Sequence, residues 1–269
     1  MALVPFPSAR SGDDEDPESA DSGSKMSFLE HLDELRKRLI YICWSLLAGC
    51  IVSYIFIQKI FDFIMKPMYT MLAQQPNGGA KLMFTSGAEP FMLYIKIGFI
   101  AGVFIASPLI LYQVWKFIAP GLYTQEKKFA IPFVVLSTVF FVLGGLFSHY
   151  VAFPWTWAFF ASFANDYMVF VPKVDEAFGI YSKMLLGFGV IFEMPTLVFF
   201  LARMGVVTGG FLLKHFKYAV LIITIVAAVV SPGTDAMSTI VFAVPMLALY
   251  ILSIAIAFMF QRRRDPVKS

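Results

Sequence analysis

Residues 91–114 read FMLYIKIGFIAGVFIASPLILYQV, and this stretch decides the class of fold. It holds 24 residues with a single charged side chain, Lys96. A helix of that length rises about 36 Å, at about 1.5 Å per residue, whereas the hydrocarbon core of a bilayer is about 30 Å thick. The stretch therefore predicts one membrane-spanning helix.

Five further apolar runs extend this pattern along the chain, at about 39–57, 129–153, 184–202, 218–230 and 237–260. The chain is 59% hydrophobic with a mean hydropathy of +0.75, far above the range of a soluble domain. The runs do not alternate as the strands of a membrane β-barrel would. We therefore predict an all-α polytopic membrane protein with six transmembrane helices.

The last two predicted spans are irregular. Tyr218 to Val230 gives 13 residues before a Ser-Pro-Gly turn, which reaches only about 20 Å. Either the bilayer thins at this helix or the helix begins earlier, around Phe211. Pro245 interrupts the sixth run, so its useful length stays open.

The basic residues predict the orientation. With six spans and a cytoplasmic N-terminus, 15 of the 21 Lys and Arg residues fall on the cytoplasmic side. The six on the other side are Lys59, Lys66, Lys81, Lys96, Lys173 and Lys183. This bias places both termini in the cytoplasm. The net charge of +3 is then a topology signal and does not indicate nucleic-acid binding.

Composition divides the chain into three parts. Residues 1–27 are acidic and rich in Ser, Pro and Gly, which predicts a disordered cytoplasmic tail. Residues 28–260 form the membrane domain, which opens with an amphipathic helix that runs directly into the first span. Residues 261–269 form a basic cytoplasmic tail. Outside the membrane, we expect 58–90 to turn more than once and the aromatic segment 154–179 to form an interfacial or re-entrant cap.

Enzyme motifs are poorly represented. The three histidines, His31, His149 and His215, do not have metal-ligand spacing, and the sequence contains no Gly-rich phosphate-binding loop. Ser86 lacks the surroundings of a serine nucleophile. We therefore predict a protein that is not an enzyme and that uses neither a metal nor a cofactor.

Glu193 is the most costly residue in the chain, because it lies within the fourth apolar run. An acidic residue in mid-membrane costs about 2.5 to 3.5 kcal/mol on insertion scales. A protonated carboxyl bonded to a neighbouring helix would explain it, and so would a contact with a partner or a transport site. Pro195 frees a backbone carbonyl nearby that could hold the proton of Glu193.

Glu34 and Glu126 are two carboxylates on the predicted cytoplasmic rim, each among basic groups. Taken singly, Glu34 would pair with Arg38 one helical turn away, and Glu126 with a loop lysine. Taken together, they would suit a short segment that carries two guanidinium groups, through charge-assisted contacts.

Four motifs in order carry a family resemblance: HLDELRKRL (31–39), SPLILYQVWKFIAPGLYTQEKK (107–128), FGVIFEMP (188–195) and SPGTD (231–235). They resemble TatC, the twin-arginine translocase subunit, and the resemblance covers residues 28–260. It implies a cupped six-helix bundle with both termini cytoplasmic and with short fifth and sixth spans. The implied function is a receptor for twin-arginine signal peptides in the bacterial inner membrane, and the core subunit of a translocase that exports folded proteins by means of the proton-motive force.

The resemblance also implies partners and site residues. The partners are single-span proteins of the TatA and TatB type, folded cargo with twin-arginine signals, and further copies of the chain. The signal-binding positions are Glu34, Arg36, Pro108, Phe117, Pro120, Leu122 and Glu126. Glu193 and Asp235 match positions of the partner-binding face. Departures from the pattern are the long acidic N-terminus and Gly121. The alternative is a small proton-coupled transporter that uses Glu193.

Overall fold

The structure is a computed structural model that describes residues 28–73, 82–118, 130–165, 167–231 and 236–260. These residues form ten α-helices and one π-helical turn. The elements are α1 (Phe28–Ile55), α2 (Ile57–Ala73), α3 (Glu89–Ile118), α4 (Ala130–Phe147), η4 (Ser148–Ala152), α5 (Phe153–Ala161), α6 (Val174–Ile191), α7 (Met194–Arg203), α8 (Gly209–Lys214), α9 (Phe216–Val230) and α10 (Ala236–Phe260). The all-α prediction is confirmed for this part of the chain.

Five helical stretches are long and apolar enough to cross a membrane. They are His31–Ile55, Glu89–Phe117, Ile131–Ala161, Val174–Arg203 and Ala236–Phe260. The shorter apolar helix Phe216–Val230 is the sixth candidate. Many of the large apolar side chains on these helices are exposed, as Trp44 is at 64%, which suits contact with lipid. The chain is therefore a multi-pass membrane protein, and the count of six spans stays a prediction.

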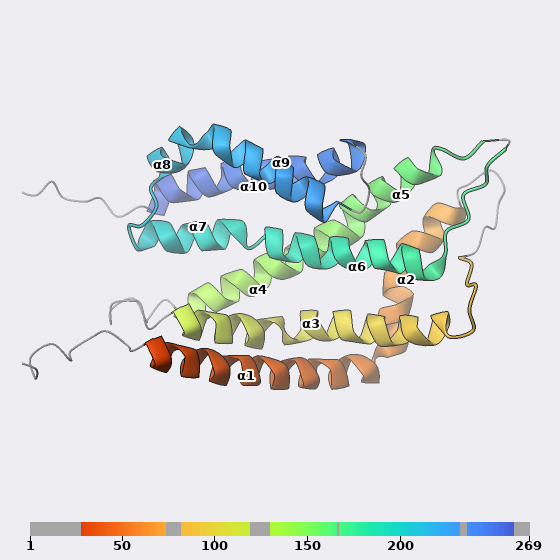
Figure 1. The fold of residues 1–269 in the computed structure, drawn as a ribbon, viewed down its shortest axis with the longest axis horizontal. Coiled ribbons are helices and arrows are strands. Elements are labelled where there is room, and N and C mark those ends of the chain that lie inside the picture. The colour runs from red at the N-terminus through yellow and green to blue at the C-terminus, as the bar shows by residue number, and fades with distance from the viewer. Residues whose placement is uncertain (1–27, 74–81, 119–129, 166, 232–235, 261–269) are drawn as a thin grey trace, which may run out of the picture.

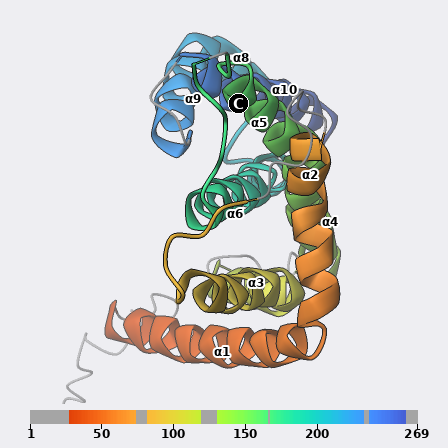
Figure 2. The same ribbon diagram turned by 90° about the vertical axis from the view of Figure 1, so that its right-hand side faces the viewer.

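The helices follow an arc when the molecule is viewed from one end. In Figure 2, α1 and α3 lie at the bottom, α2 and α4 lie at the right with α2 in front, and α9 and α10 lie at the top. Figure 1 shows the same long helices side by side, with α4 tilted across the others. The main core lies where α2, α3, α6 and α10 meet, around Phe178, Tyr181, Phe188 and Phe242.

Small residues bring α1 and α3 into close contact. A Cβ atom added to Gly49 would lie 2.5 Å from the carbonyl oxygen of Gly102 and 2.9 Å from the Cβ of Ala106. A Cβ added to Gly102 would likewise lie 2.7 Å from the sulfur of Cys50. The missing side chains of these glycines therefore let the two helix backbones touch, as small residues do at helix contacts in membranes.

Two segments that we expected outside the membrane are more helical than predicted. Residues 57–73 form α2 rather than a turning loop, because Ile64, Met68 and Leu72 repeat every four residues and are buried along one face. Residues 153–161 form α5, which continues the helix of the third span through η4, so this part of the expected interfacial or re-entrant cap is helical and the cap itself stays a prediction. Trp157 packs on other helices and is only 2% exposed, whereas Trp155 is exposed.

The last spans differ from the expectation in part. The fifth is short, as predicted, and it does not begin near Phe211, because α8 ends at Lys214 and α9 starts at Phe216. The sixth is 25 residues long, so the expected short sixth span is wrong. Pro245 lies inside α10 without ending it. Proline is tolerated there because neighbouring helices and local adjustments satisfy the freed backbone groups in membrane helices.

Candidate functional site

The antiparallel packing of α1 on α3 sets up a polar cluster where α1 begins and α3 ends. Arg38 lies 11 residues before Gly49, and Gln113 lies 11 residues after Gly102. Equal spacing on antiparallel helices brings the two side chains opposite each other, about 17 Å from the glycine contact. Arg38 Nη1 accordingly donates to Gln113 Oε1 at 3.4 Å. We refer to Glu34, Arg38 and Gln113 as the rim cluster.

Glu34 is the acidic member of the rim cluster. Arg38 Nη2 lies 3.0 Å from Glu34 Oε1, so the predicted pairing one turn apart is observed. The Glu34 side chain is only 16% exposed and that of Arg38 22%. Glu34 Oε2 is buried and has no hydrogen-bond partner among the described residues. An unpaired buried acceptor costs about 1 to 3 kcal/mol, so a donor that reaches Oε2 would be stabilising.

The other predicted rim residues that the structure describes lie at different distances from this cluster. Phe117 stacks on His31, with 4.6 Å between ring centroids, one turn from Glu34 on α1. Arg36 is exposed on α1. Pro108 lies nine residues before Phe117 inside α3, roughly 14 Å along the axis, so it shapes the helix at a distance from Glu34. It cannot bond the Phe104 carbonyl, which accepts a 2.8 Å bond from Ser107 Oγ instead.

An aromatic contact joins the end of α3, close in sequence to Gln113 of the rim cluster, to the start of α4. Trp115 at the end of α3 stacks on Phe133 at the start of α4, with 4.4 Å between centroids. Phe200 of α7 meets Trp115 edge-on at 4.5 Å. Pro120, Leu122 and Glu126 lie in that segment, outside the described residues, and Asp235 lies outside them as well.

Glu193 lies at the junction of α6 and α7. Helix α6 ends at Ile191, and Pro195 lies in the first turn of α7, where a proline is tolerated. The backbone of Glu193 takes part in both helices, because its N–H donates to Val190 O at 3.1 Å and its carbonyl accepts from Leu197 N at 2.9 Å. The predicted bond between its carboxyl and a freed carbonyl is not seen, since Oε1 is buried without a partner in the described part of the chain.

Two hydroxyl side chains complete a buried polar group around Glu193. Ser137 of α4 lies beside its carboxyl, and Thr196 follows one turn later on α7. Ser137 is 1% exposed and Thr196 fully buried. The Ser137 hydroxyl faces the Glu193 carboxyl without meeting the geometry of a full hydrogen bond, and Thr196 Oγ1 has no partner among the described residues. We refer to Ser137, Glu193 and Thr196 as the membrane polar cluster, which combines unpaired donors and acceptors in an apolar setting.

Sequence reasoning missed Ser137 and Thr196. The spacing of Glu193 and Thr196 by three residues was a usable signal, because such side chains share a helix face. Ser137 gave no such signal, since only packing brings α4 to α6 and α7. Gly144 allows that approach, because a Cβ there would lie 2.3 Å from the Phe188 carbonyl oxygen. The rim cluster and the membrane polar cluster share no residue. No three His, Cys, Asp or Glu side chains within the described ranges are grouped to hold a metal ion.

Comparisons with known proteins agree on one family. The family model of TatC, described as Sec-independent protein translocase protein, matches residues 30–245. The chain is 42% identical to the TatC protein of Koribacter versatilis over 234 residues, which is 87% of this chain and 86% of that one. It is 39% identical to TatC of Helicobacter pylori strain J99 over 229 residues, or 85% and 88% of the two chains.

Solved structures give the same result. A crystal structure of the twin arginine translocase receptor TatC matches with a TM-score of 0.74 at 33% identity, covering 87% of this chain and 100% of that chain. A second crystal structure of this receptor, in the detergent DDM, matches with a TM-score of 0.73 at 34% identity, over 84% and 98% of the two chains.

Proposed function

The chain belongs to the TatC family of Sec-independent protein translocase proteins, and from this we propose that it is the subunit that receives twin-arginine signal peptides. As a family member it is a component of a Tat translocase, which works with other subunits in transport and is not an enzyme. It is a multi-pass protein of the bacterial inner membrane. The receptor role is our proposal, supported by the similar solved structures that are described as receptors.

The observation that carries the proposal is Oε2 of Glu34, which is buried and has no hydrogen-bond partner among the described residues. Its partner oxygen is already bound to Arg38, which holds the carboxylate in one orientation. A guanidinium group from a signal peptide can therefore bond to Oε2 without displacing Arg38. Such a charge-assisted bond is about twice as strong as a neutral one. Phe117, stacked on His31, offers an aromatic face beside this position.

We infer that Glu126 receives the second arginine of the signal. The described residues that flank its segment support this, because Trp115 near the end of α3 contacts Phe133 near the start of α4. Arg36, Pro108, Pro120 and Leu122 belong to the same proposed peptide surface, on the strength of the family motif.

The membrane polar cluster is the proposed contact for a partner helix. A single-span partner of the TatA or TatB type that carries a polar side chain would satisfy Glu193, Ser137 and Thr196 together. Asp235 is proposed for the same face from the motif alone. Family membership does not favour the alternative of a proton-coupled solute transporter that uses Glu193. We further propose that the translocase exports folded cargo by means of the proton-motive force, and that the chain assembles with further copies of itself.

We also propose the topology in full: six spans, both termini cytoplasmic, a 1–27 acidic tail and a 261–269 basic tail. Single cysteines at Asn77 and Ser269, in a chain whose Cys43 and Cys50 are replaced by alanine, should react with a membrane-impermeant reagent from opposite sides. Reaction from the same side would contradict the six-span arrangement.

The function itself is tested by peptide binding. The purified full chain in lipid nanodiscs should bind a signal peptide with an Arg-Arg pair and should bind the same peptide with a Lys-Lys pair much more weakly. Lysine lacks the planar fork of donors that matches a carboxylate. Equal affinity for the two peptides would contradict the receptor proposal.

A further inference from the structure

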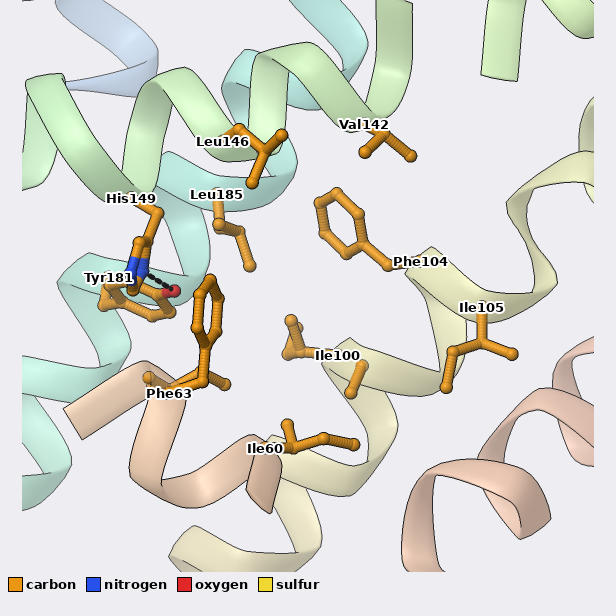
Figure 3. Close-up of a pocket in the computed structure, with 13 residues that line it drawn as sticks. Ile60, Phe63, Ile100, Phe104, Ile105, Val142, Leu146, His149, Tyr181 and Leu185 are labelled. Carbon is orange, nitrogen blue, oxygen red and sulfur yellow. Dashed lines mark hydrogen bonds between the residues drawn. The ribbon is translucent and has the colours of Figure 1, made fainter. Parts of the chain in front are cut away.

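An apolar cavity lies between α2, α3, α4 and α6, away from both clusters described above. Its volume is about 240 Å³, and Figure 3 shows apolar side chains from all four helices around it. Two polar side chains, His149 and Tyr181, stand in its wall, where His149 Nδ1 lies 2.9 Å from the Tyr181 hydroxyl. Because these groups bond to each other, the wall stays apolar and suits a hydrocarbon chain.

A second cavity of about 370 Å³ adjoins the first and is partly polar. Both are lined by Phe63 and His149, whose rings stack with 4.2 Å between centroids and form the partition. The second cavity is also lined by Lys66 and Thr70 of α2 and by Tyr150 of η4. Within the described ranges, no carboxylate lies at ion-pair distance from the Lys66 ammonium. This cavity therefore offers a cation and hydroxyl groups to an anionic ligand.

Exposed aromatic residues indicate the depth of the second cavity. Tyr69, Tyr150 and Trp155 are 71%, 63% and 60% exposed. Exposed Tyr and Trp residues on membrane proteins gather at the level of the lipid headgroups. The apolar cavity continues from there along the spans, toward Ile105 of α3 and Val142 of α4 (Figure 3). The second cavity thus lies at the level of the lipid headgroups, and the adjoining apolar cavity lies at the level of the hydrocarbon chains.

Part of the wall of both cavities comes from a π-helical turn. Pro154 has no N–H group, so a regular α-helix would leave the Tyr150 carbonyl unpaired. The chain adopts the π-turn Ser148–Ala152 instead, in which the Phe153 N–H donates to the Ser148 carbonyl. His149 and Tyr150, which line the cavities, both lie in this turn. Single π-turns in helices occur frequently at functional sites.

We propose that the two adjoining cavities bind one phospholipid with an anionic headgroup, its phosphate beside Lys66 and one acyl chain in the apolar cavity. A lysine ammonium group binds a phosphate oxygen through a charge-assisted hydrogen bond. The surrounding bilayer supplies the ligand, and the unpaired ammonium group selects for negative charge. The site does not depend on the proposed receptor function, because it shares no residue with the rim cluster or the membrane polar cluster.

Photo-crosslinking of the purified full chain in detergent tests this site. The probes are phosphatidylglycerol and phosphatidylcholine, each with the same photoreactive group near the end of one acyl chain. We expect phosphatidylglycerol to label the cavity wall on α3 and α4, as mapped by mass spectrometry, and to label it several-fold more than phosphatidylcholine. Equal labelling by the two lipids, or labelling spread evenly over the exposed faces of all helices, would overturn the proposal.

Two variants with matched controls separate the headgroup from the acyl chain. Lys66→Gln should lower the preference for phosphatidylglycerol about fivefold, the change expected on losing one lysine at a membrane surface, whereas Lys59→Gln on the same helix should not. Val142→Phe should fill the apolar cavity and abolish labelling by both lipids, whereas Val135→Phe on the same helix should not. If either variant loses its helical content, the labelling result of the other variant decides whether the proposal holds.

The same experiment separates lipid from peptide. An apolar peptide segment that carries the photoreactive group should not label this wall when phosphatidylglycerol is present. Labelling by the peptide that excess phosphatidylglycerol does not reduce would mean that the cavities receive a protein segment, and it would overturn the lipid proposal.

Discussion

Replacing Glu34 by glutamine should weaken binding of the Arg-Arg signal peptide more than any other single neutral substitution on α1. The substitution keeps the size of the side chain and removes its charge. The structure explains why the effect should be large, since Glu34 Oε2 is buried and unpaired while Oε1 is already bonded to Arg38. The incoming guanidinium therefore makes a new bond and does not exchange one partner for another.

The expected magnitude follows from the type of bond. A hydrogen bond to a charged group contributes about 1.5 to 3 kcal/mol. Its loss corresponds to an increase in Kd of roughly 10-fold to 150-fold. An exposed ion pair would contribute only about 0 to 1 kcal/mol, or less than about sixfold in Kd. The two interpretations of Glu34 therefore predict separable results.

The assay is a double-mutant cycle between the protein and the peptide. Fluorescence anisotropy gives the Kd of labelled Arg-Arg and Lys-Lys peptides for the parent chain and for Glu34→Gln, in nanodiscs. Glu34→Gln also replaces the ion pair with Arg38 by a weaker neutral hydrogen bond and lowers stability, but this effect is common to both peptides and cancels in the cycle. Asp33→Asn is the control, because Asp33 is exposed, adjacent in sequence and equal in charge.

The reasoning would be refuted if Glu34→Gln weakened both peptides equally, since the carboxylate would then not distinguish arginine from lysine. It would also be refuted if Asp33→Asn had the same effect, because the general negative field of the rim would then account for the binding.

Three further predictions concern other parts of the molecule. Glu126→Gln should cost about 1.5 to 3 kcal/mol of peptide affinity and Glu126→Asp less, whereas a loss below about 1 kcal/mol for Glu126→Gln would indicate an exposed ion pair. Glu193→Ala should reduce crosslinking to a single-span partner and leave peptide affinity intact; unchanged crosslinking would mean that the membrane polar cluster only stabilises the fold. Gly49→Ala should lower the stability of the chain in detergent by about 1 to 3 kcal/mol, because its Cβ would press on the Gly102 backbone. Gly179→Ala, whose Cβ would meet open space, should not, and equal shifts in Tm would contradict the close α1–α3 contact.

The sequence by itself determined the class of protein, its family and the costly position of Glu193. Each of these features depends on a short, contiguous stretch of the sequence. A span is a run of about 20 apolar residues, and the cost of a carboxyl within such a run does not depend on which helix packs beside it. The motifs are short and contiguous as well. The continuity of α1 from its amphipathic start into the first span could be predicted for the same reason.

Only the tertiary structure decided which polar groups meet and which stay unpaired. Arg38 and Gln113 are 75 residues apart in sequence, and their contact depends on the register that Gly49 and Gly102 set between α1 and α3. The spare oxygen of Glu34 is visible only once its neighbours are in place. Helix α2 also escaped the search for apolar runs, because charged residues on its other face keep those runs short, and burial of one face against other helices stabilises it. The hydrophobicity of a residue can be read from the sequence alone. Whether a buried polar group has a hydrogen-bond partner depends on a second residue, and packing decides which residue that is.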